Sequence, residues 1–252
     1  MNRRKTQTLA PVTVSEADGV RFLHLGTPWV QGAMRVKKPY EIELEYVQRM
    51  MAWMLLRPEE ELTAGHAVQL GLGAGAITKF CHKKLRMHTT AVELNPEVIS
   101  VCRGWFRLPE DDDRLQVLEQ DAARYAQAPE HEGTADVLCV DLYDHEAASP
   151  VLDDEKFYRA CHRLLAPGGV MSVNLFGRDA SFERSVERIA AAFGLETLWA
   201  LKPTKEGNTV VLATKDQPHV TRAVLAARAE NIETRFSLPA GKWLRMMKHL
   251  RP

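Results

Sequence analysis

The chain has 252 residues, of which 45% are hydrophobic and 26% are charged, with 33 basic and 33 acidic side chains. This composition is ordinary for a globular protein and excludes a collagen-like, low-complexity or disordered chain. No run of residues approaches the roughly 20 apolar positions of a membrane span, and no apolar stretch follows the basic start to form a signal peptide.

The balanced charge hides an acidic body, residues 11–214, between basic ends. The zero net charge of the whole chain disfavours a nucleic-acid-binding polycation. An acidic body attracts cationic ligands in a salt-dependent way, or it serves only to keep the surface soluble. The four cysteines have neither CxxC nor zinc spacing, which predicts a reducing, cytoplasmic location and no metal site.

The first sixty residues are expected to form an appendage. Residues 11–36 predict a β-hairpin, because Gly19–Leu25 alternates like a strand and a second short strand begins at Trp29. Tyr40–Leu56 is expected to be a helix, since its apolar residues recur at spacings of three and four.

From residue 65 onward, strands and helices alternate. Strands are expected at Ala67–Leu70, Thr89–Glu93, Leu115–Leu118, Ala135–Val140 and Val170–Leu175. Helices are expected from the glycine-rich turn to Lys84 and at Pro96–Phe106, Ala122–Ala126, Asp154–Leu165 and Ser181–Phe193. This alternation predicts a doubly wound, Rossmann-like α/β fold with a mostly parallel sheet.

Two late strands, Glu196–Leu201 and Thr209–Thr214, are close enough in sequence to pair antiparallel. The tail predicts two helices, Val220–Asn231 and Ala240–Leu250. We therefore expect an N-terminal hairpin and linking helix over residues 1–60, a Rossmann-like catalytic domain over 61–215 and basic C-terminal helices over 216–252.

A glycine-rich segment follows the first strand of the sheet and precedes a helix. Gly71, Gly73 and Gly75 permit a tight turn and a close approach of the backbone to a ligand. Glu93 ends the next strand about twenty residues later, where a carboxylate can bind both hydroxyls of an adenosine ribose. The pattern predicts a nucleoside site, although a merely structural turn has the same glycines.

Carboxylates also follow the third and fourth strands. Asp121 can accept a hydrogen bond from an adenine amino group or cap a helix, and Ala122 can donate its backbone N–H. Asp141 and Asp144 are spaced i and i+3 beside the glycine turn. A pair of this kind can hold an ammonium group and remove its proton, which a primary amine requires at neutral pH.

The order of these motifs resembles the spermidine synthase (polyamine aminopropyltransferase) family over about residues 15–215. The matching positions are Gln31, Tyr46, Gly71–Gly75, Glu93, Asp121–Ala122, Asp141–Asp144, Phe157–Tyr158 and Leu165–Gly169. The resemblance implies transfer of an aminopropyl group from decarboxylated S-adenosylmethionine to a small cationic amine such as putrescine, with release of methylthioadenosine. It also implies a homodimer and a role in polyamine biosynthesis.

By position, the resemblance assigns the ribose side of the donor to Gln31 and Glu93 and the adenine to Asp121. It makes Asp141 the general base and also places it in contact with the donor. Asp144 would help to bind the amine, and Tyr46 would position the substrate.

Two positions depart from related patterns. Ala74 stands where the family's loop usually has an Asp that pairs with the donor's amino group. Gln69 stands where methyltransferases often place an acid. The alternatives are therefore a methyltransferase that uses intact S-adenosylmethionine and a non-catalytic relative that only binds an adenosyl nucleoside.

Overall fold

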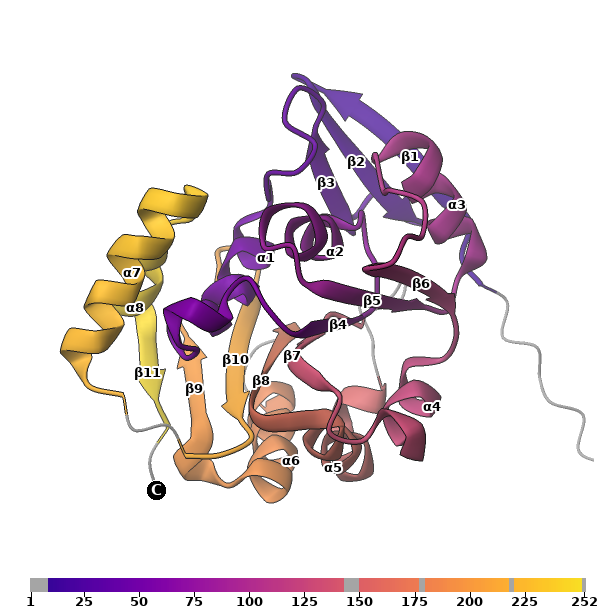
Figure 1. The fold of residues 1–252 in the computed structure, drawn as a ribbon. Coiled ribbons are helices and arrows are strands. Elements are labelled where there is room, and N and C mark those ends of the chain that lie inside the picture. The colour runs from indigo at the N-terminus through magenta and orange to yellow at the C-terminus, as the bar shows by residue number, and fades with distance from the viewer. Residues whose placement is uncertain (1–8, 143–149, 177–179, 218–219, 251–252) are drawn as a thin grey trace, which may run out of the picture.

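The computed structural model describes residues 9–142, 150–176, 180–217 and 220–250. Its body is an eight-stranded sheet with helices on both faces (Figure 1). Across the sheet the strands are β11 (Met247–His249), β9 (Leu198–Leu201), β10 (Asn208–Thr214), β8 (Leu165–Phe176), β7 (Ala135–Val140), β4 (His66–Leu70), β5 (His88–Glu93) and β6 (Leu115–Glu119). The five strands from β8 to β6 are parallel, and β10 runs antiparallel to both β8 and β9. The predicted doubly wound α/β fold is confirmed.

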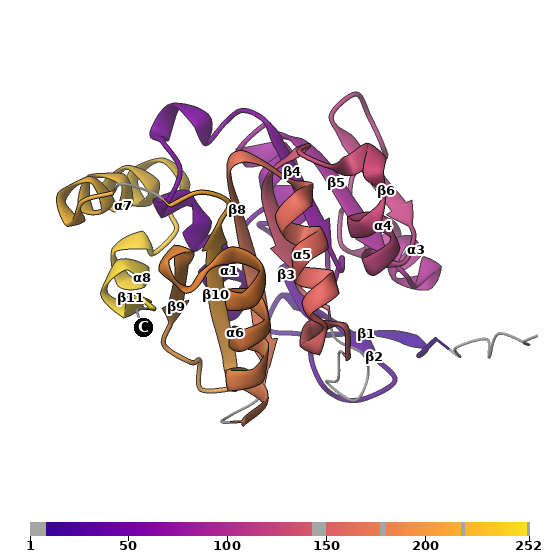
Figure 2. The ribbon, with the colours of Figure 1, turned by 90° about the horizontal axis from the view of Figure 1, so that it is seen from below.

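The helices divide between the two faces of this sheet. One face carries α1 (Glu45–Met50), α2 (Ala76–Lys79), α3 (Pro96–Trp105), α7 (Arg222–Phe236) and α8 (Ala240–Met246). The other carries α4 (Ala122–Gln127), α5 (Glu155–Leu164) and α6 (Ala180–Phe193), as Figure 2 shows. Each face encloses its own apolar core, and Trp53 and Trp243 are fully buried in the first.

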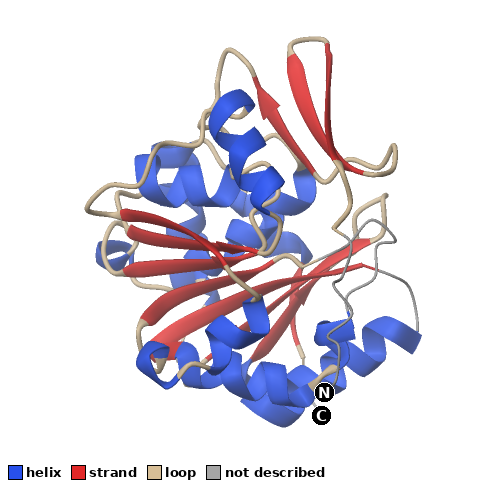
Figure 3. Cartoon of the chain, turned by 90° about the vertical axis from the view of Figure 1, so that its right-hand side faces the viewer, coloured by secondary structure: helices blue, strands red, loops and turns tan. Residues whose placement is uncertain are grey.

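A separate antiparallel sheet precedes the main body and stands above it (Figure 3). Its strands are β1 (Val12–Ala17), β2 (Val20–Leu25) and β3 (Gly32–Arg35), so the expected two-stranded hairpin was incomplete. Asp18 and Gly19, both with positive φ, form the tight turn between β1 and β2. The strand expected from Trp29 begins three residues later.

The helix predicted over Tyr40–Leu56 was wrong in its first part. After Pro39 the chain makes a turn, in which the N–H of Glu41 donates to the carbonyl of Lys38, and α1 begins only at Glu45. It continues as a 3₁₀ helix, η1 (Met51–Leu55), all of whose residues are buried. The helix after the glycine turn also differs, because α2 ends at Lys79 and a π-helical turn follows over Phe80–Lys84.

The tail differs from the prediction in its last residues. The helix expected over Ala240–Leu250 ends at Met246, and Met247–His249 forms β11 against β9. Without β11, β9 would be an edge strand with unpaired backbone N–H and C=O groups, and β11 pairs with them. Within the described ranges, no helix is long and apolar enough to cross a membrane.

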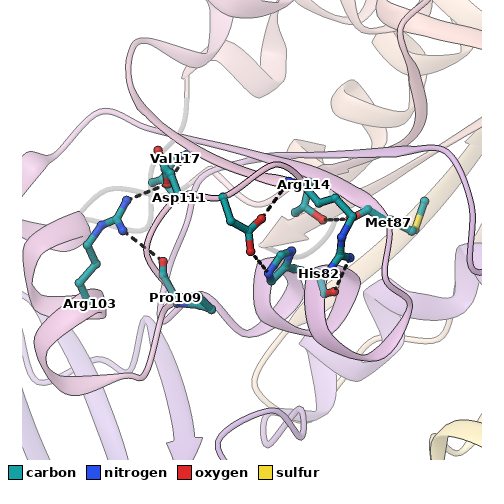
Figure 4. Close-up of polar contacts among 9 residues, drawn as sticks. His82, Met87, Arg103, Pro109, Asp111, Arg114 and Val117 are labelled. Atoms are coloured by element: carbon teal, nitrogen blue, oxygen red, sulfur yellow. Dashed lines mark hydrogen bonds and ion pairs between the residues drawn. The ribbon is translucent and has the colours of Figure 1, made fainter.

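The acidic connection between α3 and β6 is held by hydrogen bonds and ion pairs at its two ends (Figure 4). Arg103 donates to Pro109 and Asp111, and Arg114 donates to the carbonyl oxygen of His82. The His82 ring lies 3.0 Å from Asp112. These contacts give Asp111 and Asp112 partners within the fold.

Candidate active site

A cavity of about 960 Å³ lies between the small N-terminal sheet and the carboxyl ends of the parallel strands. It opens where β4 and β7 are neighbours, which is the switch point at which doubly wound sheets bind ligands. Its volume is at the upper end of the range for small-molecule sites, so it can hold two small substrates.

The glycine turn forms one wall of this cavity. Gly71 has φ +86°, and a Cβ there would overlap the backbone carbonyl of Asp141, the residue that follows β7. Glycine is therefore required where the segments that follow β4 and β7 pass close to each other. Gly71 and Gly73 line the cavity. Gly75 does not line it; this residue has a φ of +68° and is the N-cap of α2.

Gln69 holds the turn from inside the protein. Its Nε2 donates to the carbonyls of Gly71 and Leu72 at 2.7 and 3.3 Å, and its Oε1 accepts from the backbone N–H and hydroxyl of Thr78 at 2.9 and 2.5 Å. This buried amide joins the turn to α2. From the sequence we noted only that Gln69 replaces an acid. A polar residue inside the apolar strand β4 was the signal that could have indicated this structural role.

Ala74 packs against the small N-terminal sheet. A Cβ on Gly32 would lie 2.5 Å from the Cβ of Ala74, so β3 rests directly on the glycine turn. This close approach places Gln31, the residue before β3, in the cavity wall. It also explains how a segment far away in sequence comes to cover the site.

Glu93 ends β5 and faces the cavity. Its Oε2 accepts from the N–H of Leu72 and its Oε1 from the N–H of Asn95, both at 2.9 Å. Desolvation raises the pKa of the Glu93 carboxyl, and these backbone donors oppose that shift. The carboxylate is thus fixed in orientation and can accept further hydrogen bonds from hydroxyl groups.

Asp121 and Ala122 line the cavity at the adjacent strand end. Asp121 caps α4, since its Oδ1 accepts from the N–H of Arg124 at 2.8 Å. The cap orients the carboxylate without preventing a contact to a ligand, so the two interpretations of this residue are compatible.

Asp141 follows β7 and is held by two polar neighbours. Tyr46 donates its hydroxyl to Oδ2 at 3.2 Å, and Asn174 donates its Nδ2 to Oδ1 at 2.9 Å. Desolvation raises the pKa of Asp141, while these two hydrogen bonds oppose the shift. A fixed carboxylate with an elevated pKa suits a general base.

Asn174 was missed by the sequence reasoning because it lies within a mostly apolar stretch of β8. It also donates to Oδ1 of Asn208 at 3.2 Å. The second predicted acid, Asp144, lies outside the described residues.

The charged side chains that line the described part of the cavity are all acidic. Its described lining residues include five acids and no Lys, Arg or His; the acids are Glu45, Glu93, Asp121, Asp141 and Glu206. Hydrogen bonds from Lys242 and Arg49 lower the pKa of Glu45, which keeps it ionised. Across the described ranges, no group of three or more His, Cys, Asp or Glu residues is arranged to hold a metal ion. The acidic lining of the cavity favours positively charged ligands.

Comparisons with known proteins identify the family of this chain. The model of the spermine/spermidine synthase domain matches residues 71–222. A polyamine aminopropyltransferase of Chromobacterium violaceum is 31% identical over 248 residues, which cover 98% of this chain and 92% of the relative.

Two solved structures share the architecture. A probable spermidine synthase from Corynebacterium glutamicum superimposes with a TM-score of 0.73 at 18% identity, covering 93% of this chain and 88% of that one. Human methyltransferase-like protein 13, in complex with SAH, superimposes with a TM-score of 0.66 at 24% identity, covering 81% and 93%. Because both identities are below 25%, these two likenesses show only that this chain shares the fold.

Proposed function

Because the chain belongs to the spermine/spermidine synthase family, we propose that it transfers an aminopropyl group from decarboxylated S-adenosylmethionine to a cationic amine acceptor. The observation that carries the proposal is the Asp141 carboxylate, oriented by Tyr46 and Asn174 beside the glycine turn. Gln31, Glu93, Asp121 and Ala122 lie around the same cavity. In this proposal they bind the adenosyl part of the donor.

The reaction is a direct displacement. The acceptor reaches the site as an ammonium ion, and Asp141 removes a proton from its nitrogen to give a neutral amine. The nitrogen lone pair then attacks the methylene carbon bonded to the sulfonium. The new C–N bond forms as the C–S bond breaks, and the bonding electrons leave with sulfur, which becomes the neutral thioether of methylthioadenosine. The protein contributes orientation and an acidic environment that favours both cations.

The charge of the cavity favours the decarboxylated donor. Intact S-adenosylmethionine carries a carboxylate, for which the described lining residues offer no cationic side chain and five acidic ones. The decarboxylated donor carries only positive charges on its sulfonium and amino groups. Burying an unpaired carboxylate among acids costs more than burying an ammonium there.

Methyl transfer is the second candidate, because one feature weakens the case for the decarboxylated donor. Ala74 provides no carboxylate for the amino group of a decarboxylated donor, and it is buried against Gly32. A methyltransferase would use the same ribose and adenine contacts, so the two functions differ in the released nucleoside.

The test is to incubate the protein with each donor and a panel of amines and to identify the nucleoside released. Methylthioadenosine from the decarboxylated donor supports the proposal. S-adenosylhomocysteine from the intact donor, with no turnover of the decarboxylated one, identifies a methyltransferase. Neither product with any amine, despite nucleoside binding, identifies the non-catalytic relative.

We further propose a cytoplasmic homodimer that acts in polyamine biosynthesis. All four cysteines are free and buried, which agrees with a reducing compartment. Light scattering of the purified protein tests the dimer, and a mass of about 28.4 kDa would refute it.

A further inference from the structure

The basic C-terminal helices reach back to the linking helix beside the cavity. Arg228 of α7 donates to the carbonyl oxygen of Leu55 at 3.0 Å, and Lys242 of α8 donates to Oε1 of Glu45, also at 3.0 Å. Both partners belong to the continuous segment formed by α1 and η1. Glu45 also lines the cavity, so the basic charge of the tail is directed at one wall of the proposed site.

Apolar packing holds α8 against the same segment. Trp243, the residue after Lys242, is 1% exposed and belongs to the apolar core that contains Val47 and Met50 of α1. A large side chain in a close-packed core fixes the helix that carries it. Lys242 therefore reaches Glu45 from a rigid support.

Glu45 joins two cations at the start of α1. In addition to Lys242, its Oε1 accepts at 2.8 Å from Arg49, which lies one turn later on the same helix. Arg49 is only 5% exposed, and its other terminal nitrogen donates to the carbonyl oxygen of Lys202, directly after β9. These contacts tie the first turn of α1 both to α8 and to the sheet.

The start of α1 has no side-chain cap. Its N-cap residue is Leu44, which makes no capping hydrogen bond through its side chain. The helix has six residues, a length that is not stable in isolation. The first turn of α1 therefore depends on tertiary contacts for its position, among them the two ion pairs of Glu45.

Tyr46 transmits this position to the proposed base. It follows Glu45 directly, and its hydroxyl donates to Oδ2 of Asp141 at 3.2 Å. Hydroxyl donors ordinarily lie within about 3.0 Å of their acceptors, so this bond is already long. A small displacement of the first turn of α1 is enough to break it.

We propose that Lys242 is a positioning residue for Asp141 and that it acts through Glu45 and Tyr46. The C-terminal helix α8 thereby takes part in aiming the base at the acceptor amine. This inference deepens the proposed function and rests on it only for the chemical role of Asp141. The contacts themselves predict an effect of Lys242 on the Asp141 carboxyl, whatever reaction that carboxyl serves.

The first test measures the pKa of Asp141. Carbon NMR titration of protein labelled with ¹³C in its aspartate carboxyl groups reports this pKa, and the Asp141 signal is the one that is absent from Asp141→Asn. The hydrogen bond from Tyr46 lowers the pKa of Asp141. Its loss in Lys242→Met should therefore raise that pKa by about 0.3 to 1 pH unit. Lys242→Arg keeps the charge and should restore the wild-type value.

Turnover provides the second test. On the acid limb, kcat of Lys242→Met at a fixed pH should fall about two- to tenfold, the factor that corresponds to this change in pKa, while KM for the donor stays within about twofold. The melting temperature should fall by no more than about 4 °C, because the side chains of Lys242 and Glu45 are both partly exposed. A merely structural role would lower the melting temperature and leave the pKa of Asp141 unchanged.

Two comparisons show whether the effect follows the proposed route. Lys248→Met is the matched control, since Lys248 is an exposed lysine of the same tail whose side chain has no hydrogen bond or ion pair among the described residues. It should match wild type in pKa, kcat and KM. In a Tyr46→Phe background, Lys242→Met should have no further effect on the pKa of Asp141, because the hydroxyl that transmits the effect is missing.

An unchanged pKa of Asp141 in Lys242→Met overturns the proposal. So does a shift of the same size in Lys248→Met or in the Tyr46→Phe background. A raised pKa in a protein that turns over neither donor with any amine refutes the proposed function and leaves the positioning role standing. Turnover with a wild-type pKa and acid limb in Lys242→Met refutes the positioning role alone.

Discussion

Gln69 gives the most direct test of how the glycine turn is held. The substitution Gln69→Leu keeps the approximate size of the side chain and removes all four hydrogen bonds to Gly71, Leu72 and Thr78. A buried polar group left without its partner costs about 1–3 kcal/mol. The Thr78 N–H and the Gly71 carbonyl lose such a partner, so the free energy of unfolding should fall by about 2–6 kcal/mol.

A second variant at the same position tests the direction of the hydrogen bonds. In Gln69→Glu the side chain can still accept from Thr78, but an ionised oxygen replaces the donor facing Gly71 and Leu72. Burial and the two carbonyls should raise the pKa of the new carboxyl above its unfolded value. Below the unfolded pKa the protonated acid can donate, and stability is then lost as the pH rises through the folded pKa.

Urea denaturation at pH 4.5 and 7.5, together with methylthioadenosine affinity, measures both effects. Gln116→Leu, at an exposed position on β6, is the control and should change stability by no more than about 0.5 kcal/mol. The reasoning is refuted if Gln69→Leu matches this control and binds the nucleoside normally. Equal destabilisation of Gln69→Glu at both pH values would refute the donor role of the amide.

Three further predictions concern the turn and its surroundings. Gly71→Ala should lower the free energy of unfolding by about 3 kcal/mol or more, because the new Cβ overlaps a backbone oxygen. Gly104→Ala is the control, since Gly104 lies in open space on α3, and it should leave the melting temperature unchanged or raise it. Glu93→Gln should weaken methylthioadenosine binding about 10- to 100-fold in calorimetry, since an amide replaces a charged acceptor; unchanged affinity would remove Glu93 from the nucleoside site. Desolvation lowers the pKa of Lys79 to about 8 from its usual 10.5, so the folded state loses this proton before the unfolded chain does. Wild-type unfolding free energy should therefore gain about 2 kcal/mol from this group between pH 7 and 9.5, a gain absent in Lys79→Met, and parallel pH profiles would contradict it.

The parts of the site that were predictable lie at strand ends. Glu93 ends a strand of the parallel sheet, and Asp121 and Asp141 follow two others. Parallel strands bring their carboxyl ends to one edge. Their meeting around one cavity therefore required only the correct alternation of strands and helices.

Other features depended on contacts that a linear sequence does not specify. Asn174 and Gln69 lie inside apolar strands, and their partners come from segments distant in the chain or across the turn. The pairing of β11 depends on the free edge of β9, which exists only after the sheet has formed. The Asp18-Gly19 turn, by contrast, was a local signal for a third strand that the hairpin prediction overlooked.

The central claim is that Asp141 removes the proton from the acceptor amine, and the pH dependence of kcat for Asp141→Asn and wild type tests it most directly. Wild type should show an acid limb with an apparent pKa above that of an ordinary aspartate, because desolvation raises the pKa of Asp141. Asp141→Asn should lose at least about 100-fold in kcat and lack that limb, while it still binds methylthioadenosine. Asp113→Asn, in the exposed connection before β6, should behave as wild type. An Asp141→Asn protein that keeps the wild-type rate and the same acid limb would contradict the account.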